Sequence, residues 1–157
     1  MSFENFYNQF DTFNVGLPIF FNLCANVEEM RTFYTEILGI KENYYQKNNF
    51  IDYNSNGLTM MFFQADSIIN NMSSAKKRYS QGHFESLLWT IKIDQDAFIK
   101  AIQKLSNHEN QIKYNLSTIQ WNNDGFWNFS VDDPMWNKII IYMQPKSIPV
   151  SKIWNIF

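Results

Sequence analysis

One stretch of the chain decides its fold: Val27-Glu28-Glu29-Met30-Arg31-Thr32-Phe33-Tyr34-Thr35-Glu36-Ile37-Leu38-Gly39. Apolar residues recur in this stretch at spacings of three and four, which places them on one face of a helix. Asn26 is suited to cap the start, with Glu29 in the position of a capping box, and Gly39 is suited to end the helix. The stretch therefore predicts an amphipathic helix that buries one face.

Strand-length apolar runs lie on both sides of this predicted helix. Residues 17–24 precede it and open on a proline, whereas 42–46, 50–53 and 58–64 follow it. Asn54-Ser55-Asn56-Gly57 predicts a hairpin turn between the last two runs. The first half of the chain therefore predicts the order strand, helix, strand, strand, strand.

The same order recurs in the second half. Residues 86–93 predict a strand, and Asp94 or Asp96 caps a helix that carries apolar residues on one face. Strands are then predicted at 112–119, 126–131 and 138–144. A repeated unit of this length is typical of a fold that is built from two copies of one module.

The repeat also predicts how the chain is organised. We expect one domain made of two modules, flanked and joined by other segments. The predicted parts are an N-terminal arm at 1–16, a first module at 17–66, a linker at 67–84, a second module at 85–146 and a C-terminal tail at 147–157.

Composition excludes several classes of protein. A chain of 157 residues that is 45% hydrophobic, with 15 Phe, 8 Tyr and 5 Trp, is not intrinsically disordered. The 13 basic and 15 acidic residues leave a net charge of −2, and nucleic-acid binding needs a clustered positive field instead. The sequence therefore predicts a folded protein without a nucleic-acid partner.

The start of the chain and its cysteine content favour the cytoplasm. No basic residue precedes an apolar run near Met1, so no secretory signal is expected. No stretch approaches the roughly 20 apolar residues of a membrane span. Cys24 is the single cysteine and cannot form an internal disulfide. We expect a cytoplasmic protein with no membrane partner.

Three features together resemble the vicinal oxygen chelate superfamily, which includes glyoxalase I, bleomycin resistance proteins and extradiol dioxygenases. The Phe33-Tyr34 pair followed by Leu38-Gly39 is similar to the family's first helix. Phe129-Ser130-Val131-Asp132-Asp133-Pro134, with Asn137, is similar to its Asp-Pro-Asp-Gly-Asn turn before the last strand. The third feature is the order of elements over residues 17–146.

The resemblance implies an α+β fold of two βαβββ modules, whose curled sheet surrounds a cleft. In that family the cleft is often completed by dimerisation, so a homodimer is expected here. Ile19-Phe20-Phe21-Asn22 is also similar to the start of the PhnB-like subgroup.

Enzymes of the family hold a divalent metal with His, Gln or Glu from four strands. Carried onto this chain, the four ligand positions fall on Ile19, Met61, Leu88 and Ile140. A shift of one residue in either direction brings no His, Asp or Glu to any of them. Since metal cations bind oxygen, nitrogen and thiolate donors rather than alkyl groups, we expect no metal, no other cofactor and no catalytic residue.

Strand alternation from these positions predicts the lining of the cleft. The facing of two of its members, Trp127 and Phe129, stays open. Such an apolar, aromatic lining with a few polar points is typical of a small-molecule pocket, although the same side chains could also fill the cleft as a packed core. The candidate ligand-binding residues are Ile19, Phe21, Thr59, Met61, Phe63, Leu88, Thr90, Lys92, Trp127, Phe129, Ile140 and Tyr142.

The sequence favours a metal-free protein, similar to bleomycin resistance proteins, that binds a hydrophobic or aromatic small molecule. One alternative is a metal-dependent lyase or dioxygenase-type enzyme with relocated ligands, for which His83 and Glu85 are the candidates. Another alternative is an interaction or regulatory protein with a vestigial pocket, whose apolar tail docks a partner. Lys92 is a candidate contact for an anionic ligand, or it reaches water near the end of its strand.

Overall fold

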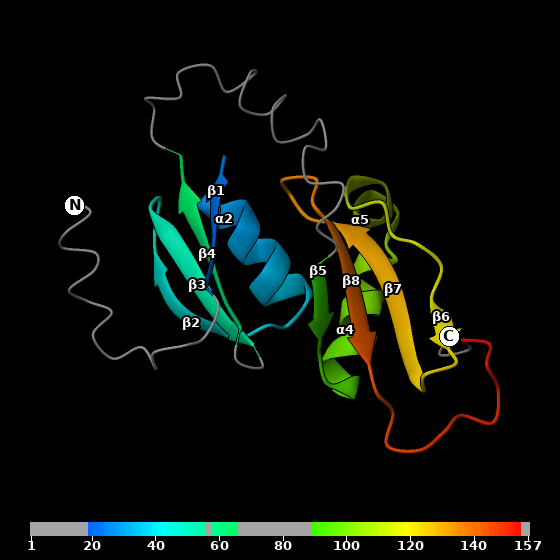
Figure 1. Ribbon diagram of the computed structural model, residues 1–157. Coiled ribbons are helices and arrows are strands. Elements are labelled where there is room, and N and C mark those ends of the chain that lie inside the picture. Colours follow the sequence, from blue (N-terminus) through cyan, green and yellow to red (C-terminus); the bar gives the residue numbers. More distant parts are fainter. Residues whose placement is uncertain (1–18, 56–57, 66–88, 155–157) are drawn as a thin grey trace.

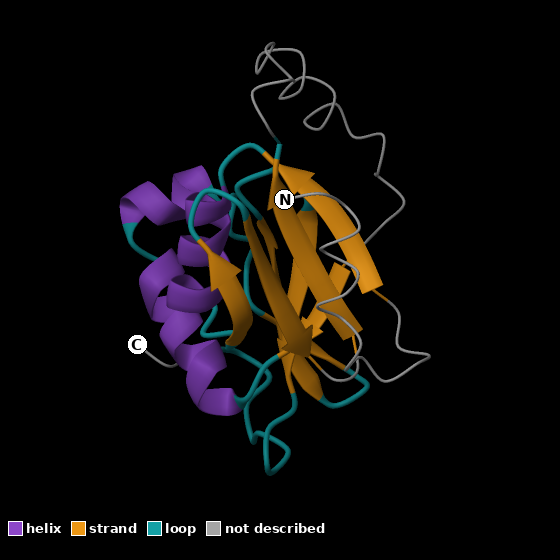
Figure 2. Ribbon diagram, turned by 90° about the vertical axis from the view of Figure 1, so that its left-hand side faces the viewer, coloured by secondary structure: helices purple, strands orange, loops and turns teal. Residues whose placement is uncertain are grey.

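Two four-stranded sheets, each backed by helices, make up the fold (Figure 1). The computed structural model describes residues 19–55, 58–65 and 89–154. Figure 2 shows the helices gathered on one side of the strands. We use "outer face" for the face of each sheet that points away from its helices. None of the helices in the described ranges has the length and apolarity that crossing a membrane requires.

The first sheet, sheet A, has the strand order β1-β4-β3-β2. β1 (Ile19–Cys24) runs parallel to β4 (Leu58–Gln64). β3 (Phe50–Ser55) is antiparallel to β4 and to β2 (Glu42–Gln46). The predicted strands are therefore confirmed, and β3 extends two residues further than the sequence pattern indicated.

The predicted first helix is confirmed. α2 (Val27–Arg31) continues without a break into η1 (Thr32–Ile37), a π-helical turn in which Leu38 N–H donates to the Phe33 carbonyl at 3.0 Å. The Asn26 side chain accepts hydrogen bonds from two backbone N–H groups of the first turn. Gly39 ends the helix with φ +73°, a conformation that glycine adopts without a Cβ clash.

The second sheet, sheet B, repeats this topology in the order β5-β8-β7-β6. β5 (Trp89–Lys92) is parallel to β8 (Lys138–Met143), and β7 (Phe126–Asp132) is antiparallel to β8 and to β6 (Gln120–Asn122). α4 (Gln95–Leu105) begins at Asp94, whose carboxylate accepts from Ala97 N–H at 2.8 Å. Of the two capping residues considered, Asp94 is the one that caps.

The strand predicted at 112–119 is wrong. The chain forms α5 (His108–Lys113) there, and Asn107 caps this helix by accepting from Asn110 N–H at 2.8 Å. Ile112, which suggested the start of a strand, is 69% exposed on α5 and takes no part in the core. The local capping signal outweighed the β-branched residue, and only the three-residue β6 remains as a strand in this region.

One core joins the two modules. The Phe33 ring packs against Tyr114 of the second module, with ring centroids 4.9 Å apart. The Tyr34 hydroxyl donates to the Asp133 carboxylate at 3.1 Å, inside the protein. Asp133 also accepts from the backbone of Met135 and from both the backbone and the side chain of Asn137. The Asp-Pro turn is thus a structural junction between the modules. The helix-facing sides of both sheets are buried against the helices in the shared core.

Candidate functional site

Alternation in sheet A separates a helix-facing side from an outer face. Ile51, Tyr53 and Met60 belong to the core shared with the helices. Phe50 and Met61 form a separate buried cluster on the opposite side of the sheet. The outer face is therefore apolar and buried, which distinguishes it from the ordinary solvated side of a sheet.

Aromatic rings run across three neighbouring strands of this outer face. Tyr44 on β2 stacks on Phe50 of β3 with ring centroids 5.2 Å apart, and Phe50 stacks on Phe63 of β4 at 5.3 Å. Both pairs have an interplanar angle of 22°, the geometry of offset stacking. We call Tyr44, Phe50 and Phe63 the aromatic ladder.

A carboxylate lies beside the aromatic ladder. Asp52 pairs across the sheet with Tyr44 on one side and Met61 on the other, and only 2% of its surface is exposed. The Asn43 side-chain N–H donates to Asp52 Oδ2 at 2.9 Å, whereas Oδ1 has no hydrogen-bond partner within the described ranges. Burial raises the pKa of Asp52 above its usual range, and the hydrogen bond from Asn43 opposes that rise only in part.

The resemblance carries metal-ligand positions onto residues whose side chains offer no donor atom suited to a metal ion. Met61 is fully buried on the outer face, and Ile140 lies half-buried on β8. Ile19 is on β1, where it pairs with Thr59. In the part of the chain that the structure describes, no three His, Cys, Asp or Glu side chains are grouped to hold an ion. Leu88 lies outside the described residues.

The residues proposed for a relocated metal site, His83 and Glu85, also lie outside the described residues, so that alternative remains a prediction from sequence. Cys24 offers no replacement ligand or nucleophile, because burial raises the pKa of its thiol to about 12.

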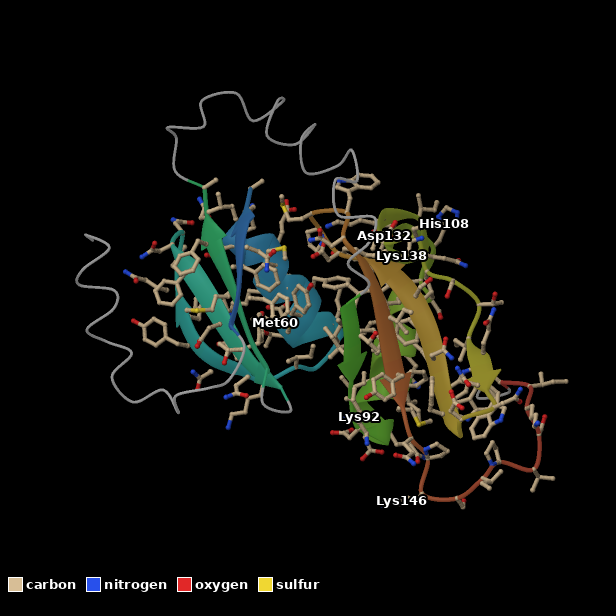
Figure 3. All side chains as sticks on the ribbon, in the orientation of Figure 1. Met60, Lys92, His108, Asp132, Lys138 and Lys146 are labelled. Carbon is tan, nitrogen blue, oxygen red and sulfur yellow. The ribbon has the colours of Figure 1, made fainter. Side chains whose placement is uncertain are left out.

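The outer face of sheet B is more polar than that of sheet A. Thr90 and Lys92 are exposed on β5, and the Lys92 ammonium contacts Gln144 Oε1 at 3.4 Å. Tyr142 pairs with Lys92 across the sheet and packs on the Phe126 ring with centroids 5.3 Å apart. Figure 3 shows Lys92 at one end of sheet B and Lys138 at the other.

Two candidates for the lining do not belong to either outer face. Trp127 and Phe129 lie on the helix-facing side of β7 and are buried in the core. Trp127 packs against Trp154 of the tail, and Phe129 packs against Phe98 of α4. This settles the facing that the sequence left open: both residues support the fold, and neither is available to a ligand on the outer face.

Of the predicted lining residues, Thr59, Met61 and Phe63 lie on β4, and the strand register puts Ile19 and Phe21 beside them on β1. Thr90, Lys92, Ile140 and Tyr142 likewise share one face of sheet B. Sequence reasoning missed Asp52 and Asn43. The signal was available, because alternation through 50–53 places Asp52 with Phe50 and opposite Ile51.

A hollow of about 440 Å³ lies elsewhere, where the end of η1 meets the start of α4. Its walls carry two carboxylates, of Asp94 and Asp96, and two ammonium groups, of Lys100 and Lys146. This hollow is on the helix side of the protein and shares no residue with the predicted lining.

The buried carboxylate of Asp52 predicts a measurable effect of pH on stability. The pKa of Asp52 is higher in the folded protein than in the unfolded chain. The free energy of unfolding therefore decreases as the pH rises from the ordinary pKa of an aspartate through the raised pKa of Asp52. Asp52→Asn removes this titration. We expect the variant to unfold at a higher temperature than the wild type at neutral pH, with the difference shrinking toward pH ~3. Equal thermal midpoints at neutral pH would contradict the assignment of Asp52 as a buried charge.

No protein-family model matches the sequence, and no curated protein matches it significantly. Solved structures do match. Fosfomycin resistance protein FosX from Mesorhizobium loti superposes with a TM-score of 0.54 at 9% identity, covering 85% of this chain and 96% of that one. A glyoxylase/bleomycin resistance protein/dioxygenase domain from Frankia sp. EAN1pec gives 0.54 at 11% identity, covering 86% and 94%.

A glyoxalase-related enzyme from Fulvimarina pelagi gives a TM-score of 0.53 at 12% identity, covering 84% of this chain and 90% of that chain. The matches span nearly the whole of each solved chain, so both modules and their arrangement are shared, although few residues are identical. The chain therefore has a glyoxalase-like fold, an α+β architecture of two βαβββ modules.

Proposed function

We propose that this protein binds a hydrophobic or aromatic small molecule without the help of a metal, and that sheet A provides the main contact surface. The observation that carries the proposal is the aromatic ladder of Tyr44, Phe50 and Phe63 beside Met61. The resemblance carries one of the family's metal-ligand positions onto Met61. Stacked rings recognise flat apolar groups, whereas an apolar strand position offers a metal no donor.

The likeness to a fosfomycin resistance protein supports a role directed at a small molecule. Tyr142 and Phe126 of sheet B supply a second apolar contact, with Lys92 beside them for an anionic substituent. A homodimer, which the family resemblance implies, would set an outer face of one copy against that of another and enclose the ligand. The cytoplasm remains the expected location.

Tyr44 gives the most direct test, because its ring is half-exposed at the end of the aromatic ladder and its removal leaves the core intact. A thermal-shift screen of aromatic compounds should identify stabilising ligands of the wild type. Tyr44→Ala should weaken their binding by about tenfold, since a stacked aromatic pair contributes roughly 0.5–1.5 kcal/mol beyond its buried area.

Trp136→Ala is the matched control, because Trp136 is also exposed but lies in the turn before β8. It should leave the affinities unchanged. The proposal fails if no aromatic compound stabilises the wild type, or if Tyr44→Ala and Trp136→Ala change the affinities equally.

The tail favours the interaction hypothesis in one respect. Trp154 anchors it to the core through the Phe98 and Trp127 rings, while Ile148, Val150 and Ile153 remain exposed. An exposed apolar segment held against the body is suited to contact a second protein. We therefore retain a partner-binding tail as the second candidate function.

A further inference from the structure

After β8 the chain leaves sheet B through an irregular segment, residues 145–153, which we call the tail loop. Figure 1 shows this segment swinging away from the end of the sheet and returning to the body. Of the large apolar residues that the structure describes, the three most exposed lie on it: Val150 is wholly exposed, Ile148 is 81% exposed and Ile153 is 71% exposed. Single exposed apolar residues are ordinary, whereas a group of them marks a contact surface.

The tail loop is held in place rather than left to collapse onto the body. Trp154 packs on Phe98 and Trp127 with ring centroids 5.5 and 4.9 Å apart, which fixes the end of the loop. Within the loop, Ile153 N–H donates to Ser151 Oγ at 3.1 Å. The tryptophan of this segment is therefore used inside the protein, and the side chains that remain outside are aliphatic.

The kind of exposed side chain distinguishes between possible partners. The residues that dominate binding to other proteins are mostly Trp, Tyr and Arg, and Val is under-represented among them. The core of a bilayer accepts any aliphatic side chain, and the gain depends only on the apolar area that is buried. Ile148, Val150 and Ile153 therefore fit a lipid surface better than a protein partner.

The charge of the tail loop matches a surface of anionic lipids. From 144 to 157 the sequence contains Lys146 and Lys152 and no acidic residue, although the whole chain has a net charge of −2. Both lysines are exposed. Lys92, whose ammonium contacts the Gln144 side chain at 3.4 Å, lies at the same end of sheet B as Lys146 (Figure 3).

Acidic residues at the start of α4 do not cancel this positive charge. Asp94 and Asp96 line the hollow described above, where Lys100 and Lys146 balance them. Lys92 and Lys152 remain in excess, since none of the ion pairs within the described ranges includes either of them. Each lysine near an anionic bilayer strengthens binding by about fivefold.

We propose that the tail loop rests on an anionic lipid bilayer, with Ile148, Val150 and Ile153 reaching below the headgroups and Lys146 and Lys152 beside the lipid phosphates. The backbone stays at the level of the headgroups, where water satisfies its polar groups. The expectation of no membrane partner rested on the lack of a membrane span, which a loop at the bilayer surface does not need. The inference is independent of the aromatic ligand and gives the tail a lipid surface in place of a second protein.

Co-sedimentation of the full-length protein with sucrose-loaded vesicles tests the inference. Vesicles of phosphatidylcholine with about 30% phosphatidylserine should bind the protein at least tenfold more tightly than vesicles of phosphatidylcholine alone. High salt should remove most of this difference, because it screens exposed charges.

Variants of the tail loop separate its two contributions. Replacing Ile148, Val150 and Ile153 together by serine should weaken binding to the mixed vesicles by about tenfold or more. Lys152→Gln should weaken it by about fivefold. The matched controls are Ile112→Ser on the exposed side of α5 and Lys138→Gln at the opposite end of sheet B, and both should bind as the wild type does.

The inference is overturned if the wild type sediments with neither kind of vesicle, or if the controls weaken binding as much as the tail variants do. It is also overturned if the vesicles leave the protein in solution while the triple serine variant changes the mass measured by light scattering, because the tail then contacts a second copy. Val150→Ser alone leaves the core untouched and provides the same test should the triple variant fail to fold. The screen of aromatic compounds decides the proposed function separately.

Discussion

Replacing Asp133 by alanine is expected to destabilise the protein by about 3 kcal/mol or more, because it leaves several buried donors without an acceptor. Asp133 is 3% exposed and accepts from the Tyr34 hydroxyl, the backbone N–H groups of Met135 and Asn137, and the Asn137 side chain. No water is expected to replace these contacts in a closely packed junction.

Urea unfolding followed by tryptophan fluorescence measures the free energy of unfolding for this comparison. Asp124→Ala is the matched control, since Asp124 is exposed in the turn between β6 and β7 and should change stability by no more than about 0.5 kcal/mol. If the Asp133 and Asp124 variants unfold at the same urea concentration, the Asp-Pro turn does not hold the modules together.

Phe33→Ala is expected to cost about 3–5 kcal/mol, the usual range for removing a fully buried phenylalanine. Its ring has no exposed surface and meets Tyr34 edge-on at 5.1 Å and Tyr114 at 4.9 Å. The cavity would open between the first helix and the second module. The substitution would therefore weaken the junction between the modules as well as the packing of the first helix.

Phe33→Leu fills most of the same space and should cost much less than the alanine variant, about 1 kcal/mol. Ile112→Ala, on the exposed side of α5, should have almost no effect. A Phe33→Ala protein with wild-type stability would show that the ring is not part of the shared core.

The sequence was informative where one periodicity dominated. Apolar runs, alternation and helical spacing predicted β2, β3 and β4, the first helix and the last two strands, because each of these elements packs at least one face into the shared core. α5 was missed since its residues are mostly polar and its capping by Asn107 is a local signal. Short polar helices carry no apolar stripe that distinguishes them from a loop or an edge strand.

The sequence predicted which sheet face carries the candidate site, but it did not predict all of the side chains on that face. Counting from motifs identified the apolar positions Met61 and Ile140, but the facing of Trp127 and Phe129 was ambiguous because β7 carries large aromatic residues on both faces. Asp52 was overlooked since a search for metal ligands at fixed positions did not include β3. Alternation placed this carboxylate on the face of Phe50, and the cross-strand register added that Met61 and Phe63 of β4 share that face.

The hydrogen bond between Tyr34 and Asp133 joins residues 99 positions apart, and this sets a constraint on synthesis at the ribosome. Sheet A has all of its strands once Gln64 has emerged, yet the apolar surface around Phe33 and Tyr34 stays uncovered until Tyr114 and Asp133 follow. Such an exposed half-core invites aggregation during translation. The core of the first module is therefore completed only when the second module has been synthesised. The nascent chain is most prone to aggregate after Gln64 has emerged and before Asp133 follows.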